Sequence, residues 1–181
     1  MPNTTLHTYP TPVGEMVAVF TPQGLRMLEF IGQPRVDREM AQVDAAAGGP
    51  AEDGRNALTE QLGHELAEYF AGERRVFDIP LDLLGTPFQQ KVWQALLEIP
   101  YGETWSYGQE AHHIGRPTAS RAVAAANGQN KVSIVVPCHR VIGSSGQLTG
   151  YGGGLPRKQF LLALEKEGSQ PQGQLWQSPA S

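Results

Sequence analysis

Cys138 is the side chain best suited to chemistry, and it is the only cysteine among 181 residues. It stands in the stretch SIVVPCHRVIG (Ser133–Gly143), where a β-branched run predicts a buried strand ending at the thiol and at His139. A free thiol has a pKa of about 8.5, so a useful nucleophile needs a base. Neighbouring side chains on a strand point apart, so a water or a turn must connect His139 to the sulfur. The alternative is a small buried hydrophobe, the usual role of an unpaired cysteine.

Glu165 is the candidate for a third group that orients the base. A nucleophile and its base rely on a further side chain that holds the base in position. Glu165 ends an otherwise apolar helix predicted after Leu155-Pro156, where a buried carboxylate needs a partner. A cysteine hydrolase would use the same residue types, but its base usually lies far from the cysteine in sequence, whereas His139 is adjacent to Cys138.

Several predicted elements must hold the cysteine-containing stretch in place. The first is a helix over residues 87–99, which starts with an N-cap, a proline and a capping-box glutamine. Ser106 is the expected N-cap of a second, short helix, and Thr118 that of a third over residues 119–127. Two short helices joined by a tight glycine-containing turn are typical of a helix-turn-helix. The glycine- and serine-rich loop over residues 141–154 would let backbone N–H groups approach a ligand closely.

The third helix is rich in alanine, and Arg121 is its only long side chain. Close packing against a neighbouring helix is one explanation. A helix slim enough for a DNA groove, with Arg121 probing the base stack, is the other, because the minor groove is only about 6 Å wide.

Charge is distributed unevenly along the chain. The first 85 residues hold 6 basic and 13 acidic side chains, a net of −7, and residues 86–168 hold 8 basic and 5 acidic, a net of +3. The asymmetry places any contact with a polyanion in the second half.

The first half predicts a small α+β unit without identifiable chemistry. Residues 13–30 read as a β-hairpin with a glycine-containing loop. An apolar stripe over residues 58–70 predicts a helix that stops at Gly72, and alternation over residues 77–81 predicts a further strand. Residues 31–56, rich in alanine, glycine and acids, read as a mobile connection.

Composition excludes several classes of protein. No apolar run approaches the roughly 20 residues of a membrane span, and the N-terminus lacks a signal-peptide layout. A lone cysteine fits a reducing cytoplasm, which is the expected location (nucleoid-associated in a bacterium), and rules out a cysteine-rich zinc site. His112 and His113 suggest a metal at first sight, but neighbours on a helix face apart, so we expect surface or packing roles.

Six blocks then combine into one pattern: GTPFQQKVW, IPYGETWSYG, RPTASRAVAAANGQN, IVVPCHRVIG, TGYGGG and FLLALE. In this order they resemble the O6-alkylguanine-DNA alkyltransferases, also called methylated-DNA–protein-cysteine methyltransferases. Close resemblance runs from about Gly85 to Glu167, and the first 84 residues fit the family's variable N-terminal domain in outline. It implies an α+β fold, with a small ribonuclease H-like α/β domain over residues 1–84 and a winged-helix-like helix-turn-helix domain over residues 85–168. Residues 169–181 are expected to form a disordered tail.

The resemblance implies DNA repair by direct, irreversible transfer of an alkyl group to Cys138, from O6 of guanine and, as a second candidate, from O4 of thymine. His139 would act as the base through a water, Glu165 would orient His139, and Asn130 would brace the active-site turn. The thioether product has no easy leaving group, and no second cysteine could resolve it. We therefore expect one turnover per molecule.

The implied partner is double-stranded DNA, bound through its minor groove with the damaged nucleotide flipped out, because a methyl on O6 is unreachable within the stack. Tyr107 would crowd the phosphate and donate a proton to the leaving guanine, and Arg121 would fill the vacated stack. Backbone carbonyls of Cys138 and Val141 would read the guanine amine. The other residues implied at the pocket or on DNA are Pro137, Tyr151, Gly152, Arg116, Ala122 and Ser144.

No metal and no cofactor is expected, and the protein is expected to act as a monomer. Two positions depart from the family's usual residues: Lys131 stands where a proline is common, which would loosen the turn or add a phosphate contact, and Gly152 stands where some members have serine. The remaining alternative is a helix-turn-helix lesion sensor or transcription factor without alkyl transfer. The family's non-repairing relatives lack the reactive cysteine, so Cys138 discriminates between the two.

Overall fold

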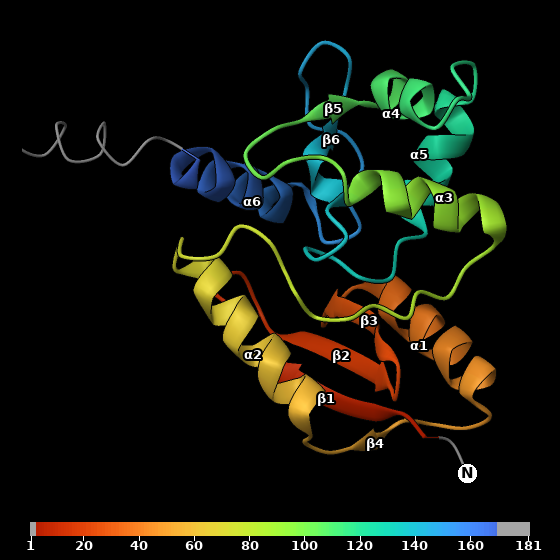
Figure 1. The fold of residues 1–181 in the computed structure, drawn as a ribbon, viewed down its shortest axis with the longest axis vertical. Helices are drawn as coiled ribbons and strands as arrows, with labels where there is room; N and C mark the ends of the chain where they lie inside the picture. The colour runs from red at the N-terminus through yellow and green to blue at the C-terminus, as the bar shows by residue number, and fades with distance from the viewer. Residues whose placement is uncertain (1–2, 170–181) are drawn as a thin grey trace, which may run out of the picture.

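A computed structural model of the chain describes residues 3–169, and the tail expected over residues 169–181 lies, apart from Ser169, outside them. Two layers of structure meet in Figure 1, a sheet flanked by helices below and a cluster of helices above. The predicted α+β class is confirmed.

The first domain is built on a four-stranded sheet of order β3-β2-β1-β4. Its strands are β1 (Thr5–Tyr9), β2 (Met16–Thr21), β3 (Gly24–Phe30) and β4 (Glu52–Asp53). The hairpin predicted over residues 13–30 is confirmed as the antiparallel pair β2 and β3. Strand β1 pairs antiparallel with β2, and the short β4 pairs parallel with β1.

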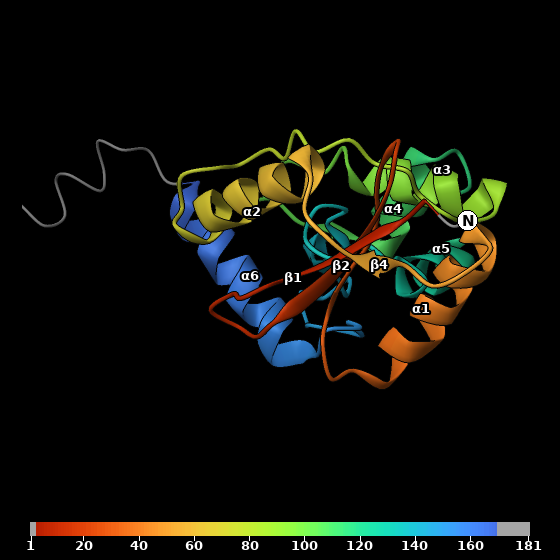
Figure 2. The ribbon, with the colours of Figure 1, turned by 90° about the horizontal axis from the view of Figure 1, so that it is seen from below.

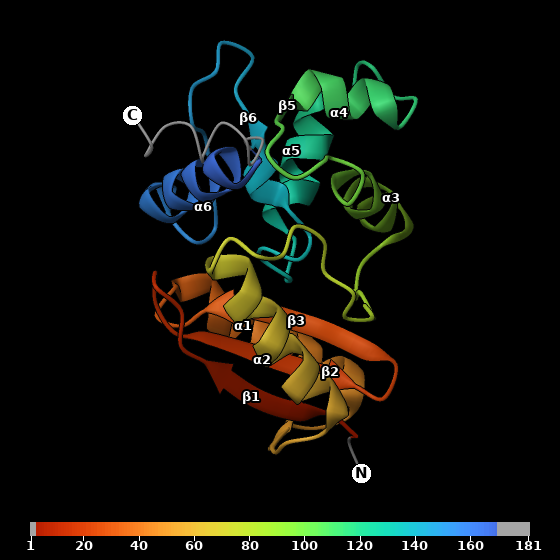
Figure 3. The ribbon, with the colours of Figure 1, turned by 60° about the vertical axis from the view of Figure 1, so that its left-hand side comes forward.

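Both faces of this sheet are covered, which explains why every residue of β2 is buried. Helix α1 (Pro34–Ala47) packs on the face that carries Val17 and Val19. Helix α2 (Ala57–Phe70) and the second domain cover the opposite face, which carries Ala18 and Phe20. Figure 3 shows α2 crossing in front of the strands, and Figure 2 shows α1 and α2 on opposite sides of them.

Residues 31–56, expected to be a mobile connection without secondary structure, instead contain α1 and β4, which occupy most of the segment. Pro34 stands at the start of α1, where its missing N–H is harmless. Val36, Met40 and Val43 then recur at helical spacing and contact the sheet. The alanine-rich composition hid this stripe.

The strand predicted over residues 77–81 is also absent, and only Leu81 forms an isolated bridge, to Leu25. Pro80 explains this, because a proline has no N–H for a ladder. Its carbonyl still accepts from Leu25 N at 2.8 Å. The segment therefore crosses the edge of the sheet as a linker.

The second domain holds the pair of short helices, joined by a glycine-containing turn, that the sequence predicted. Its elements are α3 (Pro87–Leu96), β5 (Trp105–Ser106), α4 (Tyr107–His113), α5 (Ser120–Gly128), the 3-10 turn η1 (Cys138–Arg140), β6 (Val141–Ile142) and α6 (Leu155–Gly168). Thr86 caps α3 in a capping box and Ser106 caps α4, as predicted, and Gln109 completes a capping box at α4 as well. The cap expected from Thr118 is wrong. A turn from Ala119 N to Arg116 O comes first, so α5 begins at Ser120 without a side-chain cap.

The two domains share one hydrophobic core and a backbone connection. Leu28 of β3 donates to Lys131 O and accepts from Ser133 N, both at 2.8 Å. The segment that precedes the cysteine is therefore attached directly to the first domain's sheet. Within residues 3–169, no helix is both long and apolar enough to cross a membrane.

Candidate active site

Cys138 opens a single 3-10 turn, and the chain before it is not the predicted strand. Ile134 has a φ of 72°, a left-handed conformation that is costly for a β-branched residue. It is nevertheless 1% exposed, so tertiary packing holds it there. The β-branched run is buried as expected, but as successive turns that bend the backbone toward the thiol.

Asn130 holds these turns together from inside. Its Nδ2 donates to Val136 O and its Oδ1 accepts from Val132 N, both at 2.9 Å. Cys138 N donates to the same Val136 carbonyl at 2.8 Å. The side chain thus replaces the ladder bonds that a strand would have supplied, in the position expected of a brace.

His139, Glu165 and Arg140 form a buried relay behind the thiol. His139 Nε2 lies 2.7 Å from Glu165 Oε2, and Arg140 Nε donates to Glu165 Oε1 at 2.8 Å. Burial alone would raise the pKa of Glu165, but His139 and Arg140 hold that pKa far below its usual range. Burial lowers the pKa of His139, and Glu165 offsets part of this effect. The pair is therefore a carboxylate and an imidazole poised to accept a proton.

The tautomer of His139 follows from its neighbours. Because Nε2 faces a carboxylate, the ring proton belongs on Nε2. Nδ1 is buried and has no hydrogen-bond partner within the described chain. This leaves a lone pair on Nδ1, one residue from the cysteine.

Cys138 lines a hollow of about 340 Å³ between α5 and the loop after the turn. Burial raises the pKa of the thiol to about 11, although the Asn130 amide lowers it. The resting group is thus a neutral thiol that must lose its proton to react. The other lining residues are Tyr107, Ala124, Asn127, Gly128, Gly150, Tyr151 and Gly152.

Three of the expected pocket residues meet in this hollow, namely Tyr107, Tyr151 and Gly152. The Tyr107 hydroxyl lies 3.0 Å from Thr149 Oγ1, and the Tyr151 hydroxyl is buried without a partner among residues 3–169. The sequence did not show that a Cβ at Gly152 would collide with the guanidinium of Arg35, so a larger residue there would require the end of this side chain to move.

Pro137 and Val141 lie at the margins of the site. Pro137 faces a separate hollow of about 160 Å³ behind the turn, with Tyr101 and Arg140. The Val141 carbonyl accepts from Lys158 Nζ at 2.6 Å, which fixes its direction.

Five residues were expected on DNA. Four of them are exposed, namely Arg116, Arg121, Ala122 and Ser144, and the fifth, Tyr107, is half-buried in the hollow. Arg121 and Ala122 project from the first turn of α5, and Arg116 lies over the Phe88 ring at 5.8 Å. Ser144 stands on the loop after β6. None of the four lines the hollow around Cys138, so they suit a partner that covers it from outside.

Lys131 is not placed for a phosphate contact. Its ammonium lies 3.4 Å from Leu84 O and 5.7 Å from the centre of the Trp93 ring, and burial lowers its pKa. Where a proline was expected, this lysine instead joins α3 to the linker between the domains.

Sequence reasoning missed four groups around the turn: Glu29, Lys158 and Tyr69, which are buried, and Arg35, which is partly buried. Glu29 Oε1 accepts from Ser133 Oγ at 2.6 Å, and Arg35 Nη2 donates to Asn130 O at 2.6 Å. Lys158 Nζ also donates to Thr149 O at 2.7 Å. Lys158 could have been suspected as a lysine on the apolar face of a helix. The other three carried no local signal.

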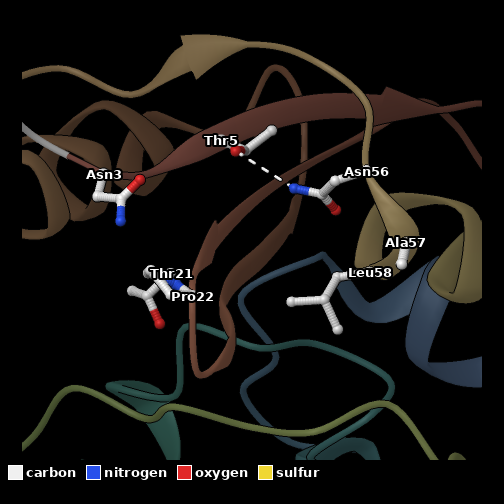
Figure 4. A pocket seen from close by; sticks show the side chains of 7 residues that line it. All are labelled: Asn3, Thr5, Thr21, Pro22, Asn56, Ala57 and Leu58. Atoms are coloured by element: carbon white, nitrogen blue, oxygen red, sulfur yellow. Dashed lines mark hydrogen bonds between the residues drawn. The ribbon is translucent and has the colours of Figure 1, made fainter.

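The hollows away from Cys138 lack such chemistry. One of about 330 Å³ lies between the sheet and the start of α2, and is lined by Asn3, Thr5, Thr21, Pro22, Asn56, Ala57 and Leu58 (Figure 4). None of these side chains is a thiol, an imidazole or a carboxylate. Within residues 3–169 no three histidine, cysteine or acidic side chains gather as metal ligands, and His113 lies 3.2 Å from Glu98.

Comparisons with known proteins match both domains of the chain to one family. Residues 5–83 match the family model described as 6-O-methylguanine DNA methyltransferase, ribonuclease-like domain, and residues 87–167 match that of its DNA binding domain. A methylated-DNA–protein-cysteine methyltransferase of Mycobacterium tuberculosis is 51% identical over 164 residues, which are 88% of this chain and 90% of the relative. One of Methanosarcina acetivorans is 42% identical over 158 residues, covering 87% and 95%.

Solved structures agree with these relatives. The crystal structure of Mycobacterium tuberculosis O6-methylguanine methyltransferase has a TM-score of 0.81 at 43% identity, over 96% of this chain and 99% of that one. The structure of the protein called OGT from the same organism, in complex with DNA, has a TM-score of 0.78 at 45% identity, over 91% and 94%.

Proposed function

Because the chain belongs to the methylated-DNA–protein-cysteine methyltransferase family, which repairs DNA by direct methyl transfer to a cysteine, we propose that Cys138 is the acceptor. It is the only cysteine of the chain. The single observation that carries the assignment is the buried relay behind it, in which His139 offers an unpartnered Nδ1 and Glu165 holds Nε2.

The transfer begins with the thiol proton, which passes through a water to His139 Nδ1. The sulfur then attacks the alkyl carbon on O6 of a flipped guanine, so that an S–C bond forms while the C–O6 bond breaks. The imidazolium is stabilised by Glu165, whose pKa is held low enough to keep it ionised. Nothing in the relay needs to move, which is the advantage of preorganised charge.

The Tyr107 hydroxyl supplies the proton that the leaving guanine needs. The electron pair of the broken bond stays on the guanine, and the leaving base takes a proton from the Tyr107 hydroxyl, which lines the hollow beside Cys138. Tyr107 is then reprotonated from solvent, while His139 releases the thiol proton. In total one proton moves from sulfur to base.

Access to the hollow requires the nucleotide to leave the stack, at a cost of a few kcal/mol. Arg121 projects from the exposed side of α5, whose neighbouring side chains are small, and is the group that fills the vacated position. The minor groove admits this helix because alanines keep it slim. Cytoplasmic location, with access to the nucleoid in a bacterium, completes the proposal.

Intact-mass analysis tests the assignment. Wild-type protein is mixed with duplex DNA that contains O6-methylguanine, and with the same duplex carrying guanine. We expect one methyl-group increment, located on Cys138 by peptide mapping, only with the damaged duplex, and none for Cys138→Ala. Tight binding of the lesion by an unmodified wild-type protein would overturn the assignment and favour a lesion sensor.

A further inference from the structure

The relay behind Cys138 is not closed by the second domain alone. Tyr69, in the last turn of α2 in the first domain, donates its hydroxyl to Glu165 Oε2 at 2.6 Å. Tyr69 is 0% exposed and Glu165 is 1% exposed. The C-terminal end of α2 lies next to α6 in Figures 1 and 2, and Phe70 meets Phe160 of α6 across the same contact.

Glu165 Oε2 therefore accepts from three side chains. His139 Nε2 lies at 2.7 Å, Tyr69 Oη at 2.6 Å and Arg140 Nη2 at 3.1 Å. Three donors that converge on one oxygen leave the carboxylate a single orientation. Hydrogen bonds to a charged group in a buried site are also the stronger kind.

Tyr69 can act only as a donor in this arrangement. Burial and the Glu165 charge raise the pKa of its hydroxyl well above the ordinary value, so it keeps its proton at every physiological pH. Its ring is held by Phe77 at 5.3 Å and, edge-on, by Tyr101 at 6.3 Å. The hydroxyl cannot swing away without disrupting this aromatic cluster.

We propose that Tyr69 is a positioning residue of the transfer reaction, whose hydroxyl fixes Glu165 and, through it, the ring of His139 with Nδ1 free to take the thiol proton. The inference rests on the proposed function of Cys138. It assigns the first domain a part in the chemistry, because that domain supplies one of the groups that complete the relay. Loss of Tyr69 would leave Oε2 with one donor fewer and a stronger hold on the imidazolium.

The charged and titratable groups that face His139 define what else could change its ionisation. They are Glu165 and Lys158 from α6, Arg140 from the same turn, and Cys138 beside it. Tyr69 and His139 are joined through hydrogen bonds to the same oxygen of Glu165. We therefore expect the effect of removing the Tyr69 hydroxyl on the ionisation of His139 to pass through this carboxylate.

The test is Tyr69→Phe, which deletes one oxygen and keeps the ring. Reaction with free O6-benzylguanine avoids DNA binding and base flipping, so its rate as a function of pH reports the relay. We expect the rate to fall about tenfold, which corresponds to about 1.4 kcal/mol. The acid limb of the profile should also move to higher pH, because His139 would then hold its proton more tightly.

Tyr9→Phe is the matched control. Tyr9 is also a buried tyrosine of the first domain, and its hydroxyl donates to Thr59 O at 2.8 Å, away from the relay. It should lower the melting temperature and leave the pH profile unchanged. Equal changes in rate and profile for both variants, or an unchanged profile for Tyr69→Phe, would overturn the proposal. Failure of the wild type to react at all would instead refute the role of Cys138.

A double-mutant cycle tests whether the effect of Tyr69 on the reaction passes through Glu165. In a Glu165→Gln background, Tyr69→Phe should reduce the rate by less than twofold, since its effect passes through the carboxylate; a further tenfold loss would contradict this. If Tyr69→Phe does not fold, the resonances of selectively labelled tyrosine in the wild-type protein test the same link between Tyr69 and His139. The Tyr69 hydroxyl resonance should shift as His139 titrates, and a resonance that ignores this titration would count against the proposal.

Discussion

Glu110 and Asn127 form a buried pair between the two helices of the helix-turn-helix. Glu110 of α4 is 0% exposed, and its Oε1 accepts from Asn127 Nδ2 of α5 at 2.8 Å. The second oxygen of Glu110 and the Oδ1 of Asn127 are buried without partners among residues 3–169. A proton on Glu110 would let it donate as well as accept. Burial accordingly raises the pKa of Glu110 from 4.5 to about 7, although Asn127 lowers it.

The magnitude follows from linkage between protonation and folding. Between pH 4.5 and about 7 the folded protein holds the Glu110 proton and the unfolded chain does not. The free energy of unfolding therefore falls as pH rises through this interval and levels off above it. A shift of roughly 2.5 pKa units corresponds to about 3.4 kcal/mol in all, of which about 2.5 kcal/mol falls between about pH 5 and about pH 8.

Glu110→Gln removes the ionisation and keeps the shape. A glutamine amide can both donate to and accept from Asn127, as the protonated acid does. Urea unfolding followed by tryptophan fluorescence at pH 5 and pH 8 measures the effect. We expect the wild type to lose about 2.5 kcal/mol more than Glu110→Gln between these values. Glu103→Gln, at an exposed position, controls for the lost charge and should behave as the wild type.

An identical pH dependence in the wild type and in Glu110→Gln would refute this reasoning. It would mean that the carboxylate remains ionised in the folded protein near pH 5. A larger pH dependence in the variant would also contradict it, since the sign of the linkage would then be reversed.

Three further predictions follow from the site. Asn130→Ala leaves the buried Val132 N without a partner and removes one of the two donors to Val136 O. It should cost about 1–3 kcal/mol in urea unfolding, whereas Gln129→Ala, at an exposed position, should be neutral; equal stabilities would contradict the bracing role. Arg121→Ala should slow repair of duplex DNA at least about tenfold more than reaction with free O6-benzylguanine, and equal losses would exclude a wedge. Lys158→Met should slow alkylation and speed proteolysis within residues 143–154, because the carbonyls of Val141 and Thr149 lose the buried ammonium that donates to them. Unchanged rates of alkylation and proteolysis would show that Lys158 does not hold this loop.

Local signals identified several elements correctly. Thr86 and Ser106 precede their helices with the residues of a capping box, and such caps depend only on three or four neighbouring positions. The same holds for the hairpin of β2 and β3, whose alternation and glycine-containing loop are local. Thr118 misled because it lies inside a turn, closed from Ala119 N to Arg116 O, that precedes α5.

Nonlocal structure decided the remainder. The run Ile134–Val136 has the composition of a strand, yet Asn130 and the edge of β3 fold it into turns. Strand propensity reflects a side chain's fit to a half-buried surface, and turns buried in a core satisfy the same side chains. Helix α1 was overlooked because alanine and glycine around it outweighed a short apolar stripe.

The sequence by itself identified the candidate groups and the family. A lone cysteine, an adjacent histidine and a carboxylate at the end of an apolar helix can be recognised by residue type, and the order of the blocks around them specified the family. What only the tertiary structure decided is how these groups are held. Tyr69 lies 96 residues from Glu165, and Glu29 lies 104 residues from Ser133. Hydrogen bonds across such separations depend on how the two domains pack, and no local pattern encodes that packing.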